Sequence, residues 1–543
     1  MAHSSLYDQV LAKVAGAEMV PMPPSRDSAS VVLWRGAGDE LEVFWLERAL
    51  GMPFMGGWHA FPGGGVAGRD GRFNPRSAPT VATEASPRAA MPESVTDGLE
   101  DLGPILVPGL AVAAVRELFE ETGILPGLTA EASSAERRAE LRLALEAKEL
   151  RLPEVLTELG LKLDVSSLVY AGRWLTPPLG PLRFDNRFFL LEWSASESLQ
   201  PVADSREAAG GEWIRPRQAI ERWRRGEVLT APPILHLMRV LEEDGPSAGL
   251  SRLHEPEEAN LGPFRLVEFR PGVMLFPVRT PTLPPAAFTN AYLLGTQSCV
   301  LIDPGSPYER EIDWLAQAVE AAAESLGREI REIWLTHHHP DHVGGAAALR
   351  ERLGVPVAAH ALTAERLCGR VTVDREIPDG EVTQLGTPGR EFTVRALHTP
   401  GHAQGHLCFL HEEFGSLVAG DVVAGFGTVV IDPPEGCMQQ YLETLDLLRD
   451  LGPRTLFPGH GPAMADGLGK LREYREHRRW REERIFRAWC RGVQDPAALL
   501  EEVYDDVPPQ AHPLARRQIV AHLERLEDLG RLAGTLGGRS ADA

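Results

Sequence analysis

Cysteine, lysine and long apolar runs are all scarce in this chain of 543 residues. Its five cysteines lie between Cys299 and Cys490 without any CxxC spacing, a pattern that favours a reducing compartment over a disulfide scaffold. No run approaches the roughly 18 apolar residues of a membrane span, and the N-terminus lacks the basic and apolar regions of a secretory signal. These absences disfavour disulfide-rich and membrane proteins, and they predict a soluble, cytoplasmic protein with no membrane partner.

Positive charge is also in short supply, because 55 Lys and Arg face 77 Asp and Glu and give a net charge of -22. This charge repels polyanions on average, so a nucleic-acid partner would need a local basic surface. Hydrophobic residues at 43% and charged residues at 24% are typical of a globular chain with more than one core. The length predicts about three or four domains, or two large ones.

A segment rich in Glu, Gly, Pro and Ser, residues 241–262, is the best candidate for a linker. Before it, the hydrophobic pattern predicts two paired strands, a helix and a further strand at residues 30–36, 41–48, 111–122 and 184–193. After it, the pattern predicts strands at residues 290–295, 299–303, 330–336, 415–421 and 455–461, with a helix at 312–327. Several of these strands end in His or Asp, as is usual for catalytic groups in α/β layers. The sequence therefore predicts an α+β protein with two unlike halves.

Three glutamates share one face of the helix expected at residues 111–122, because Glu117, Glu120 and Glu121 lie at i, i+3 and i+4. Like charges on one face repel each other. A divalent cation that prefers oxygen ligands, such as Mg²⁺ or Mn²⁺, would compensate them. A solvated acidic face is the alternative for the three residues taken alone.

Residues 116–124 (RELFEETGI) resemble the core of the Nudix box, and residues 61–66 (FPGGGV) resemble the glycine turn that precedes it. Glycine in such a turn allows the backbone to approach a phosphate closely. The chain departs from the family pattern twice. Asp70 stands where the family has Glu, and a long insertion separates it from Arg116.

This insertion, together with residues 46–65 and 183–193, looks like the acyl-CoA diphosphatase branch of the Nudix family. The resemblance covers about residues 26–240 and implies an α/β/α sandwich that cleaves a nucleoside diphosphate or CoA-like substrate. It also implies that Arg116 orients the glutamates and that Glu120 acts in catalysis. The metal ligands implied for Mg²⁺ or Mn²⁺ are Glu117, Glu120 and Glu121. Because the box is interrupted, this half is alternatively a ligand-binding module without catalytic activity.

Histidine is concentrated in the second half, where ten of the chain's 17 histidines lie between His337 and His460. Residues 336–342 read THHHPDH, in which histidines two apart can share one metal while Asp341 and His342 turn toward another. Further candidate ligands, each at the end of an expected strand, are His402, Asp421 and His460.

Together these motifs resemble the full set of the metallo-β-lactamase fold, which implies an αβ/βα sandwich with two Zn²⁺, or else Mn²⁺ or Fe²⁺, ions. By this resemblance one metal is held by His337, His339 and His402, the other by Asp341, His342 and His460, and Asp421 bridges them. Metals so placed lower the pKa of a bound water, which becomes the nucleophile of a hydrolysis. Asp341 would orient that water or carry its proton.

Residues 472–491 contain eight Arg against four Glu and form a local basic segment, either a nucleic-acid contact or a solvated amphipathic helix. The residues that follow are expected as helix, helix and short hairpin, a winged-helix pattern, at 495–506, 513–530 and 531–534. The ending resembles the β-lactamase-like protein 2 group of endoribonucleases over about residues 263–535. That resemblance makes single-stranded RNA an implied substrate, and enzymes of this fold also cleave thioesters and lactams.

The expected domain order is an N-terminal extension, a Nudix-like domain with an insertion, a linker, a metallo-β-lactamase-like domain and a helical tail. Their residues are 1–25, 26–240 with the insertion at about 71–108, 241–262, 263–470 and 471–543. The sequence favours a bifunctional metal-dependent hydrolase. The alternatives are a metallo-β-lactamase-fold hydrolase, acting on RNA or a thioester, regulated by an inactive Nudix-like module, and a nucleic-acid-binding regulator acting through the tail. The oligomeric state stays open.

Overall fold

The structure is a computed structural model in which contacts divide the chain into two compact units, separated between Leu275 and Phe276. The described residues are 24–52, 55–67, 70, 108–129, 133–163, 165–179, 183–193, 200–202, 205–254, 267–283 and 285–532. Nearly all of the predicted extension and insertion, and the second half of the predicted hairpin, lie outside these ranges. In the described part of the chain, no helix combines the length and the apolar character needed to cross a membrane.

The unit that ends at Leu275 is built on a mixed seven-stranded sheet with the order β3-β2-β1-β6-β5, in which β4 also pairs with β1 and β7 with β2. Its strands are β1 (Ser25–Arg35), β2 (Glu42–Arg48), β3 (His59–Ala60), β4 (Gly63–Gly65), β5 (Val169–Leu175), β6 (Arg183–Glu192) and β7 (Ala208–Ile214). β1 pairs antiparallel with β2 and parallel with β6, so Leu33 lies between Phe44 and Leu191. These pairings confirm the predicted strands.

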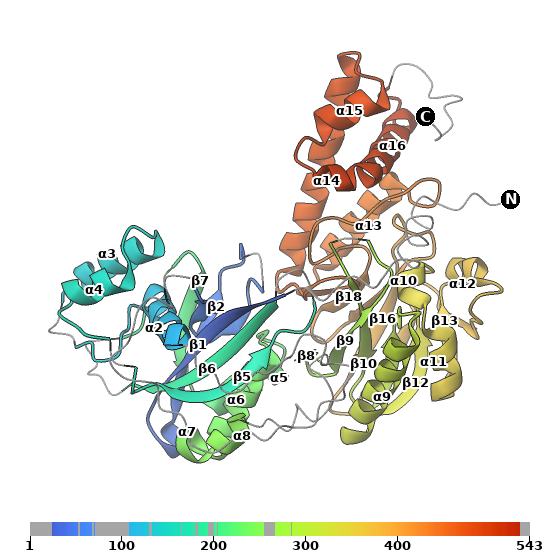
Figure 1. Ribbon diagram of the computed structural model, residues 1–543. Helices are drawn as coiled ribbons and strands as arrows, with labels where there is room; N and C mark the ends of the chain where they lie inside the picture. The colour runs from blue at the N-terminus through green and yellow to red at the C-terminus, as the bar shows by residue number, and fades with distance from the viewer. Residues whose placement is uncertain are drawn as a thin grey trace. The chain divides into compact units, whose positions relative to one another are not determined.

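Helices cover both faces of this sheet (Figure 1). They are α2 (Pro108–Thr122), α3 (Ala135–Glu146), α4 (Leu152–Glu158), α5 (Pro216–Arg224) and α6 (Pro232–Glu243), with a 3-10 turn η1 (Gly38–Glu40). Side chains alternate along β1, so Val31 and Leu33 pack with α2, α3 and α4, whereas Val32 packs with α5 and α6. This α/β/α sandwich is the arrangement that the resemblance implied.

The segment expected as a linker, residues 241–262, is largely helical up to His254. The end of α6 is followed by α7 (Gly245–Ala248) and α8 (Leu250–His254). Leu253 is buried, and His254 stacks on Tyr170 of β5 with Nε2 at 2.9 Å from the Tyr170 carbonyl oxygen. These contacts hold residues up to His254 on the unit that ends at Leu275.

Two further sheets have the strand orders β14-β13-β12-β11-β10-β9-β8 and β15-β16-β17-β18-β19, and most of their strands lie in the unit that begins at Phe276. The first sheet has β8 (Val267–Arg270), β9 (Val273–Arg279), β10 (Phe288–Leu294), β11 (Ser298–Ile302), β12 (Glu329–Trp334), β13 (Val357–Ala359) and β14 (Arg375–Glu376). The second has β15 (Val382–Gln384), β16 (Thr393–His398), β17 (Leu407–His411), β18 (Ser416–Gly420) and β19 (Thr455–Pro458). The strands predicted in this half are confirmed as β10, β11, β12, β18 and β19.

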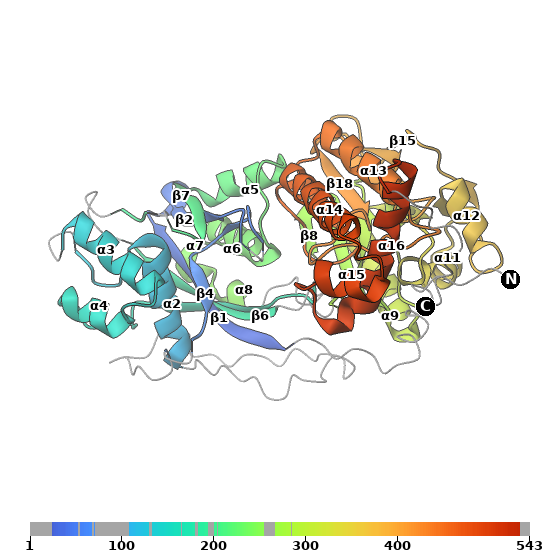
Figure 2. The same cartoon turned by 90° about the horizontal axis from the view of Figure 1, so that it is seen from above.

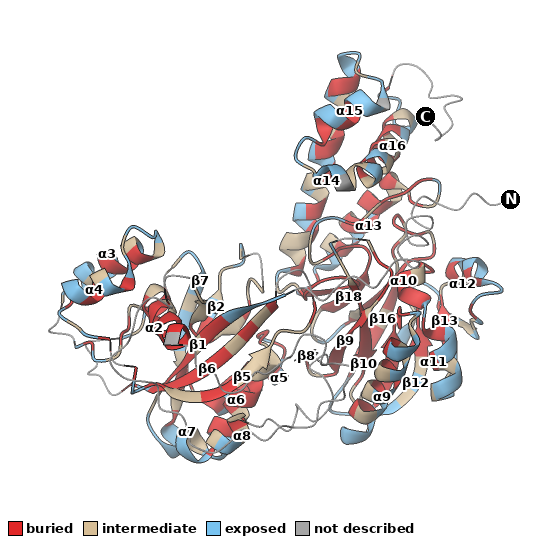
Figure 3. Cartoon of the chain, viewed as in Figure 1, coloured by how far each residue is buried: buried red, intermediate tan, exposed pale blue. Residues whose placement is uncertain are grey.

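The two sheets face each other through aromatic side chains, with the rings of Trp334 and Phe409 centred 5.0 Å apart and those of Tyr292 and Phe457 6.0 Å apart. The helices of this part are α9 (Glu309–Ser325), α10 (Pro340–Val343), α11 (Ala346–Leu353), α12 (Ala361–Leu367) and α13 (Met438–Leu451). α9 packs on the first sheet and α13 shares a core with the second. Figure 3 shows the strands as largely buried and α9 as buried on one side only. The result is the αβ/βα sandwich that the resemblance implied.

Three helices end the described chain: α14 (Gly467–Cys490), α15 (Pro496–Val503) and α16 (His512–Asp528), with a 3-10 turn η6 (Pro509–Ala511). They lie against one another around a small core of their own that includes Ile485, Leu499 and Leu526 (Figure 2). The two helices predicted after residue 495 are thereby confirmed.

Candidate metal centre and candidate carboxylate site

All seven predicted metal ligands of the second half follow the carboxyl ends of strands. Those of the first sheet, His337, His339, Asp341 and His342, come after β12. Those of the second sheet, His402, Asp421 and His460, come after β16, β18 and β19. All seven side chains are buried. The fold therefore gathers at one place residues that are far apart in the sequence.

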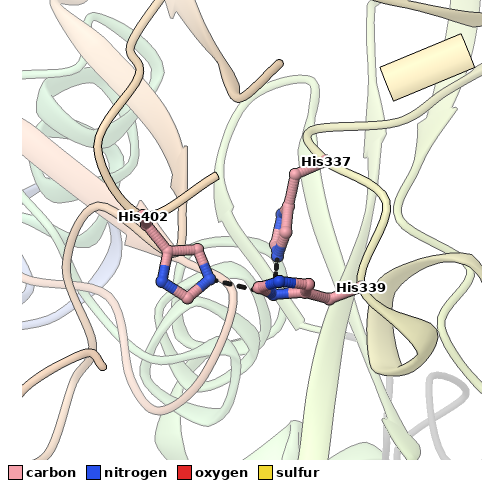
Figure 4. A group of neighbouring side chains, drawn as sticks. All are labelled: His337, His339 and His402. Atoms are coloured by element: carbon pink, nitrogen blue, oxygen red, sulfur yellow. Dashed lines mark hydrogen bonds between the residues drawn. The ribbon is translucent and has the colours of Figure 1, made fainter. Parts of the chain in front are cut away.

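Three imidazoles converge at this place, those of His337, His339 and His402 (Figure 4). Nδ1 of His339 lies 3.0 Å from Nε2 of His337 and 3.0 Å from Nε2 of His402. Nitrogen lone pairs this close repel one another unless a proton or a cation lies among them. The spacing and the nitrogen donors suit a Zn²⁺-class ion.

The second predicted group adjoins the first through Asp421. Nε2 of His460 lies 3.4 Å from Oδ2 of Asp341 and 3.6 Å from Oδ1 of Asp421. Oδ1 of Asp421 is 3.4 Å from Nε2 of His342, while its Oδ2 is 3.6 Å from Nε2 of His402. One carboxylate therefore faces both groups, which is the position expected of a bridging ligand.

In His402 and His460, Nε2 is the candidate metal ligand and the other ring nitrogen, Nδ1, has a hydrogen-bond partner. Nδ1 of His402 donates to the carbonyl oxygen of Val430 at 2.7 Å, and Nδ1 of His460 donates to that of Phe288 at 2.9 Å. A carbonyl oxygen can only accept, so the proton of each neutral ring stays on Nδ1 and the lone pair on Nε2 points into the site.

Asp303 fixes two more histidines in the same way. Its Oδ2 accepts from Nδ1 of His342 at 2.8 Å and from the hydroxyl of Thr336 at 2.6 Å. Because that hydroxyl donates to Asp303, its oxygen is left to accept from Nδ1 of His337 at 2.9 Å. Four imidazoles thus present Nε2 lone pairs, the arrangement that metal-binding histidines adopt.

Two buried atoms in the site also indicate a cation. Nε2 of His342 and Oδ1 of Asp421 have no hydrogen-bond partner among the described residues, although buried polar atoms normally have one. Burial and the neighbouring imidazoles lower the pKa of His337 well below its usual value, so this ring is held neutral. For Asp421, burial opposes ionisation, but His460, His342 and His402 outweigh it and hold the pKa well below its usual value. A neutral His337 and an ionised Asp421 fit a divalent metal ion. Burial lowers the pKa of His342 and of His460, but the neighbouring carboxylates outweigh it and raise both, and a bound cation would replace the protons that these carboxylates favour.

Sequence reasoning did not find Asp303 or Glu435 as members of this site. Oε1 of Glu435 lies 2.8 Å from Nε2 of His338 and 3.6 Å from Nε2 of His339, and the three residues form another possible metal-ligating group. His338 therefore faces a carboxylate beside the centre. A signal for Asp303 exists, because it ends a buried strand just before Pro304.

His406 holds the backbone of a ligand. Its Nε2 accepts from the amide nitrogen of Asp421 at 3.1 Å, while its Nδ1 lies 2.8 Å from the hydroxyl oxygen of Thr399. His406 therefore helps to position the backbone of Asp421 without contacting the Asp421 carboxylate through this hydrogen bond.

In the N-terminal unit, Arg116 of α2 organises the predicted carboxylates. Its Nη1 contacts Glu117 at 2.8 Å and Glu120 at 2.9 Å, and its Nη2 donates to the carbonyl oxygen of Gly65 at 2.8 Å. Both oxygens of Asp70 accept from Arg116 at 3.1 Å. Asp70, in spite of the insertion, thus reaches the arginine of the box.

Glu121 lies deepest in this site. Its Oε2 accepts from the amide nitrogen of Gly63 at 2.8 Å, and its Oε1 is buried without a hydrogen-bond partner in the described part of the chain. Burial and the nearby charge of Glu117 raise the pKa of Glu121 well above its usual value. A bound cation would reverse this effect, because it stabilises the ionised form.

The three glutamates do not form a tight ligand group in this structure. Among the residues that the structure describes, the side-chain groups whose ligand atoms lie within 4.8 Å of one another are all in the C-terminal unit. Glu117 and Glu120 form ion pairs with Arg116 instead. Close approach to the glycine turn is nevertheless clear, because a Cβ at Gly64 would lie 2.5 Å from the Glu117 carboxylate.

The arginines of residues 472–491 are largely neutralised by intramolecular partners, so the expected basic surface is much weaker than the composition suggests. Four of them pair with acidic side chains at 2.7–3.0 Å, Arg475 with Asp446, Arg481 with Asp506, Arg484 with Asp505 and Arg487 with Glu483. Arg491 contacts Glu502, and Arg478 bonds to Gln518 and to the carbonyl oxygen of Val429.

Three family models match the chain. The metallo-beta-lactamase superfamily matches residues 284–460, the NUDT19 Nudix domain residues 14–241, and the beta-lactamase associated winged helix domain residues 496–535. The beta-lactamase-like protein 2 homolog of Drosophila melanogaster is 31% identical over 259 residues, which cover 45% of this chain and 84% of that protein. This chain belongs to the metallo-beta-lactamase superfamily.

This superfamily member is also similar to the atrochrysone carboxyl ACP thioesterase of Aspergillus chevalieri, with 34% identity over 225 residues, or 41% of this chain and 68% of that protein. The chain is also similar to the solved structure of a NUDIX hydrolase from Alicyclobacillus acidocaldarius, with 27% identity and a TM-score of 0.32. The match covers 43% of this chain and 99% of that protein. Taken with the family models, the named relatives identify the chain as a hydrolase with a Nudix domain, a metallo-beta-lactamase domain and a winged helix.

Proposed function

We propose that the C-terminal half is a dinuclear-metal hydrolase. One ion would be held by His337, His339 and His402, the other by Asp341, His342 and His460, with Asp421 between them. The observation that carries this proposal is the set of Nδ1 hydrogen bonds that turn the Nε2 lone pairs of four buried histidines into one site. Zn²⁺ suits these ligands best, and Mn²⁺ or Fe²⁺ also accept them.

Two divalent cations at this site supply a water of lowered pKa and polarise the bond to be cleaved. Asp341 is buried beside that position. Burial opposes its ionisation, but the hydrogen bond to His460 and the charge of His342 lower the pKa of Asp341 to about 2. An ionised Asp341 can accept a hydrogen bond from the attacking water and so orient it, or it can carry the proton of that water.

A small acyl substrate, such as a thioester, fits the C-terminal half better than RNA. Binding of RNA depends on unpaired basic side chains, whereas most arginines of α14 already have acidic or carbonyl partners. One similar protein is named as an acyl-carrier thioesterase. Single-stranded RNA remains the rival substrate in the experiment below.

For the N-terminal half we propose a Mg²⁺- or Mn²⁺-dependent hydrolase of nucleoside diphosphate or CoA-like substrates, with Arg116 and Glu120 as catalytic residues. Support comes from Asp70, whose two carboxylate oxygens accept hydrogen bonds from Arg116 although the insertion separates the two residues in the sequence. Glu117, Glu120 and Glu121 would hold the ion. The rival is a ligand-binding module, which would bind the same compounds without cleaving them.

The test is a hydrolysis screen of the full chain with acyl-CoA, CoA, ADP-ribose and single-stranded RNA, each with Zn²⁺, Mn²⁺ or Mg²⁺. His337→Ala should abolish the thioesterase and leave the diphosphatase intact, and Glu120→Gln should lower only the diphosphatase, by about 100-fold. His360→Ala is the matched control, since His360 belongs to none of the metal-ligating groups. Cleavage of RNA but not of thioesters would overturn the acyl assignment. Ligand binding without turnover in the unmutated chain would favour the regulatory module.

A further inference from the structure

The segment of residues 429–435, between β18 and α13, contacts two histidines of the metal centre. The carbonyl oxygen of Val430 accepts from Nδ1 of His402 at 2.7 Å. The carboxylate of Glu435 lies 3.6 Å from Nε2 of His339, whose Nδ1 faces the centre. The position of this segment therefore affects the orientation of His402, and the carboxylate of Glu435 adds a charge beside His339.

The C-terminal helices hold this segment through two arginines. Arg478 of α14 donates from Nη2 to the carbonyl oxygen of Val429 at 2.5 Å. Arg517 of α16 donates from Nη2 to the carbonyl oxygen of Pro433 at 2.6 Å and from Nε to Asp432. Charged donors in a largely buried setting make strong hydrogen bonds.

The two arginines act together because their helices are joined. Nη1 of Arg478 donates to Oε1 of Gln518, the residue that follows Arg517 on α16, at 2.8 Å. The far end of the segment is tied elsewhere, since Gln404 donates to the carbonyl oxygen of Glu435 at 2.8 Å. The arginines thus govern the part that contains Val430.

The second ligand group does not depend on this segment. His460 donates to the carbonyl oxygen of Phe288 and His342 donates to Asp303, and both partners belong to the first sheet or its strand ends. Loss of the arginine contacts would therefore disturb His402 while leaving His342 and His460 in place.

We propose that Arg478 and Arg517 are positioning residues of the metal centre, so that the winged-helix tail serves as a clamp on the ligand His402. This inference rests on the proposed metal site. It assigns to the tail a role within the hydrolase itself, in addition to any contact with a substrate.

The test uses the full chain and Co²⁺ as the probe, followed by its visible absorbance and by competition with a chelator. Arg517→Ala removes the donor of one contact and Asp432→Asn removes the charge of its acceptor, so each should weaken one of two bound ions, by about 10-fold in Arg517→Ala, and leave the other unchanged. Hydrogen exchange of residues 429–433 should become faster in both variants. Arg484→Ala is the matched control, because it removes an arginine of α14 that pairs with Asp505 at 2.9 Å.

Equal Co²⁺ affinity for both ions in Arg517→Ala, Asp432→Asn and the unmutated chain would overturn the clamp. Equal weakening of both ions, or the same loss in Arg484→Ala, would also overturn it, because either result would indicate general destabilisation. A chain that binds no Co²⁺ before mutation would instead overturn the proposed metal site. Circular dichroism of each variant checks that the helices are retained.

Discussion

Asp303 accepts a hydrogen bond from Nδ1 of His342 at 2.8 Å and thereby directs Nε2 of that ring toward Asp421, 3.4 Å away. Asp303 has a φ of 48°, a left-handed conformation that Asn tolerates well. Asp303→Asn should therefore keep the backbone but place an amide group where a carboxylate accepts three hydrogen bonds, two from Thr336 and one from His342. We expect the affinity of the second ion to fall by about 10- to 100-fold, measured by competition with a chelator. Asp374→Asn, at a carboxylate paired with Arg350 at 2.6 Å, is the control, and an equal loss there would contradict the assignment.

Two adjacent glycines of β4 provide a matched pair for the carboxylate site. A Cβ at Gly64 would lie 2.5 Å from the carboxylate carbon of Glu117, whereas a Cβ at Gly65 would meet nothing within 4 Å. Gly64→Ala should displace Glu117 and lower Mg²⁺-dependent diphosphate hydrolysis by about 10-fold or more, since misplacement of a catalytic group is costly. Gly65→Ala should retain activity. Similar rates for both variants would show that Glu117 takes no part.

Metal ions should stabilise the C-terminal unit. A ligand that binds only the folded chain at 100 times its Kd adds about 2.7 kcal/mol to the free energy of unfolding. Dialysis against a chelator should lower the Tm of this unit, and Zn²⁺ should restore it. The same treatment of His337→Ala should have a much smaller effect. An unchanged Tm in the wild-type chain would contradict a buried metal centre.

His59 of β3 should make the N-terminal unit less stable in mild acid. Burial, with a smaller effect of Arg222, lowers the pKa of His59 from 6.5 to about 4. Between these values the unfolded chain takes up a proton that the folded chain excludes, so stability is complete above about pH 6.5 and is lost as the pH falls toward 4. The loss is at most about 3 kcal/mol.

His59→Gln removes this titration, so its urea midpoint should fall less than that of the wild-type chain between pH 7 and pH 4. Carboxylates titrate in both chains and cancel in the difference. Parallel pH profiles for the two chains would contradict this prediction, because they would indicate that the pKa of His59 is the same in the folded and unfolded chains.

Local patterns explain why much of the fold was predictable. The alternation of Val31, Val32 and Leu33 assigns opposite faces of β1, and both faces are covered. The spacing of residues 336–342 is likewise local, because it concerns one turn after one strand. Such features survive in a single sequence without any knowledge of distant contacts.

Features that depend on distant partners were not predictable. Asp303 acts on His342 from an earlier strand end, and the sequence does not show that their strands are neighbours. The arginine-rich segment displays its own charges but not the carboxylates, such as Asp446 and Asp506, that neutralise them. Gly, Pro and Ser around residues 245–254 concealed two short helices, because packing rather than propensity stabilises them.

Each candidate metal group combines ligands from both sheets. His337 and His339 come from the first sheet and His402 from the second, while Asp341 and His342 come from the first and His460 from the second. A bound ion would thus join the two sheets much as a covalent crosslink does. The sheets could then not separate to admit a substrate without losing the ions, so a substrate would have to reach the metal centre at the ends of the strands.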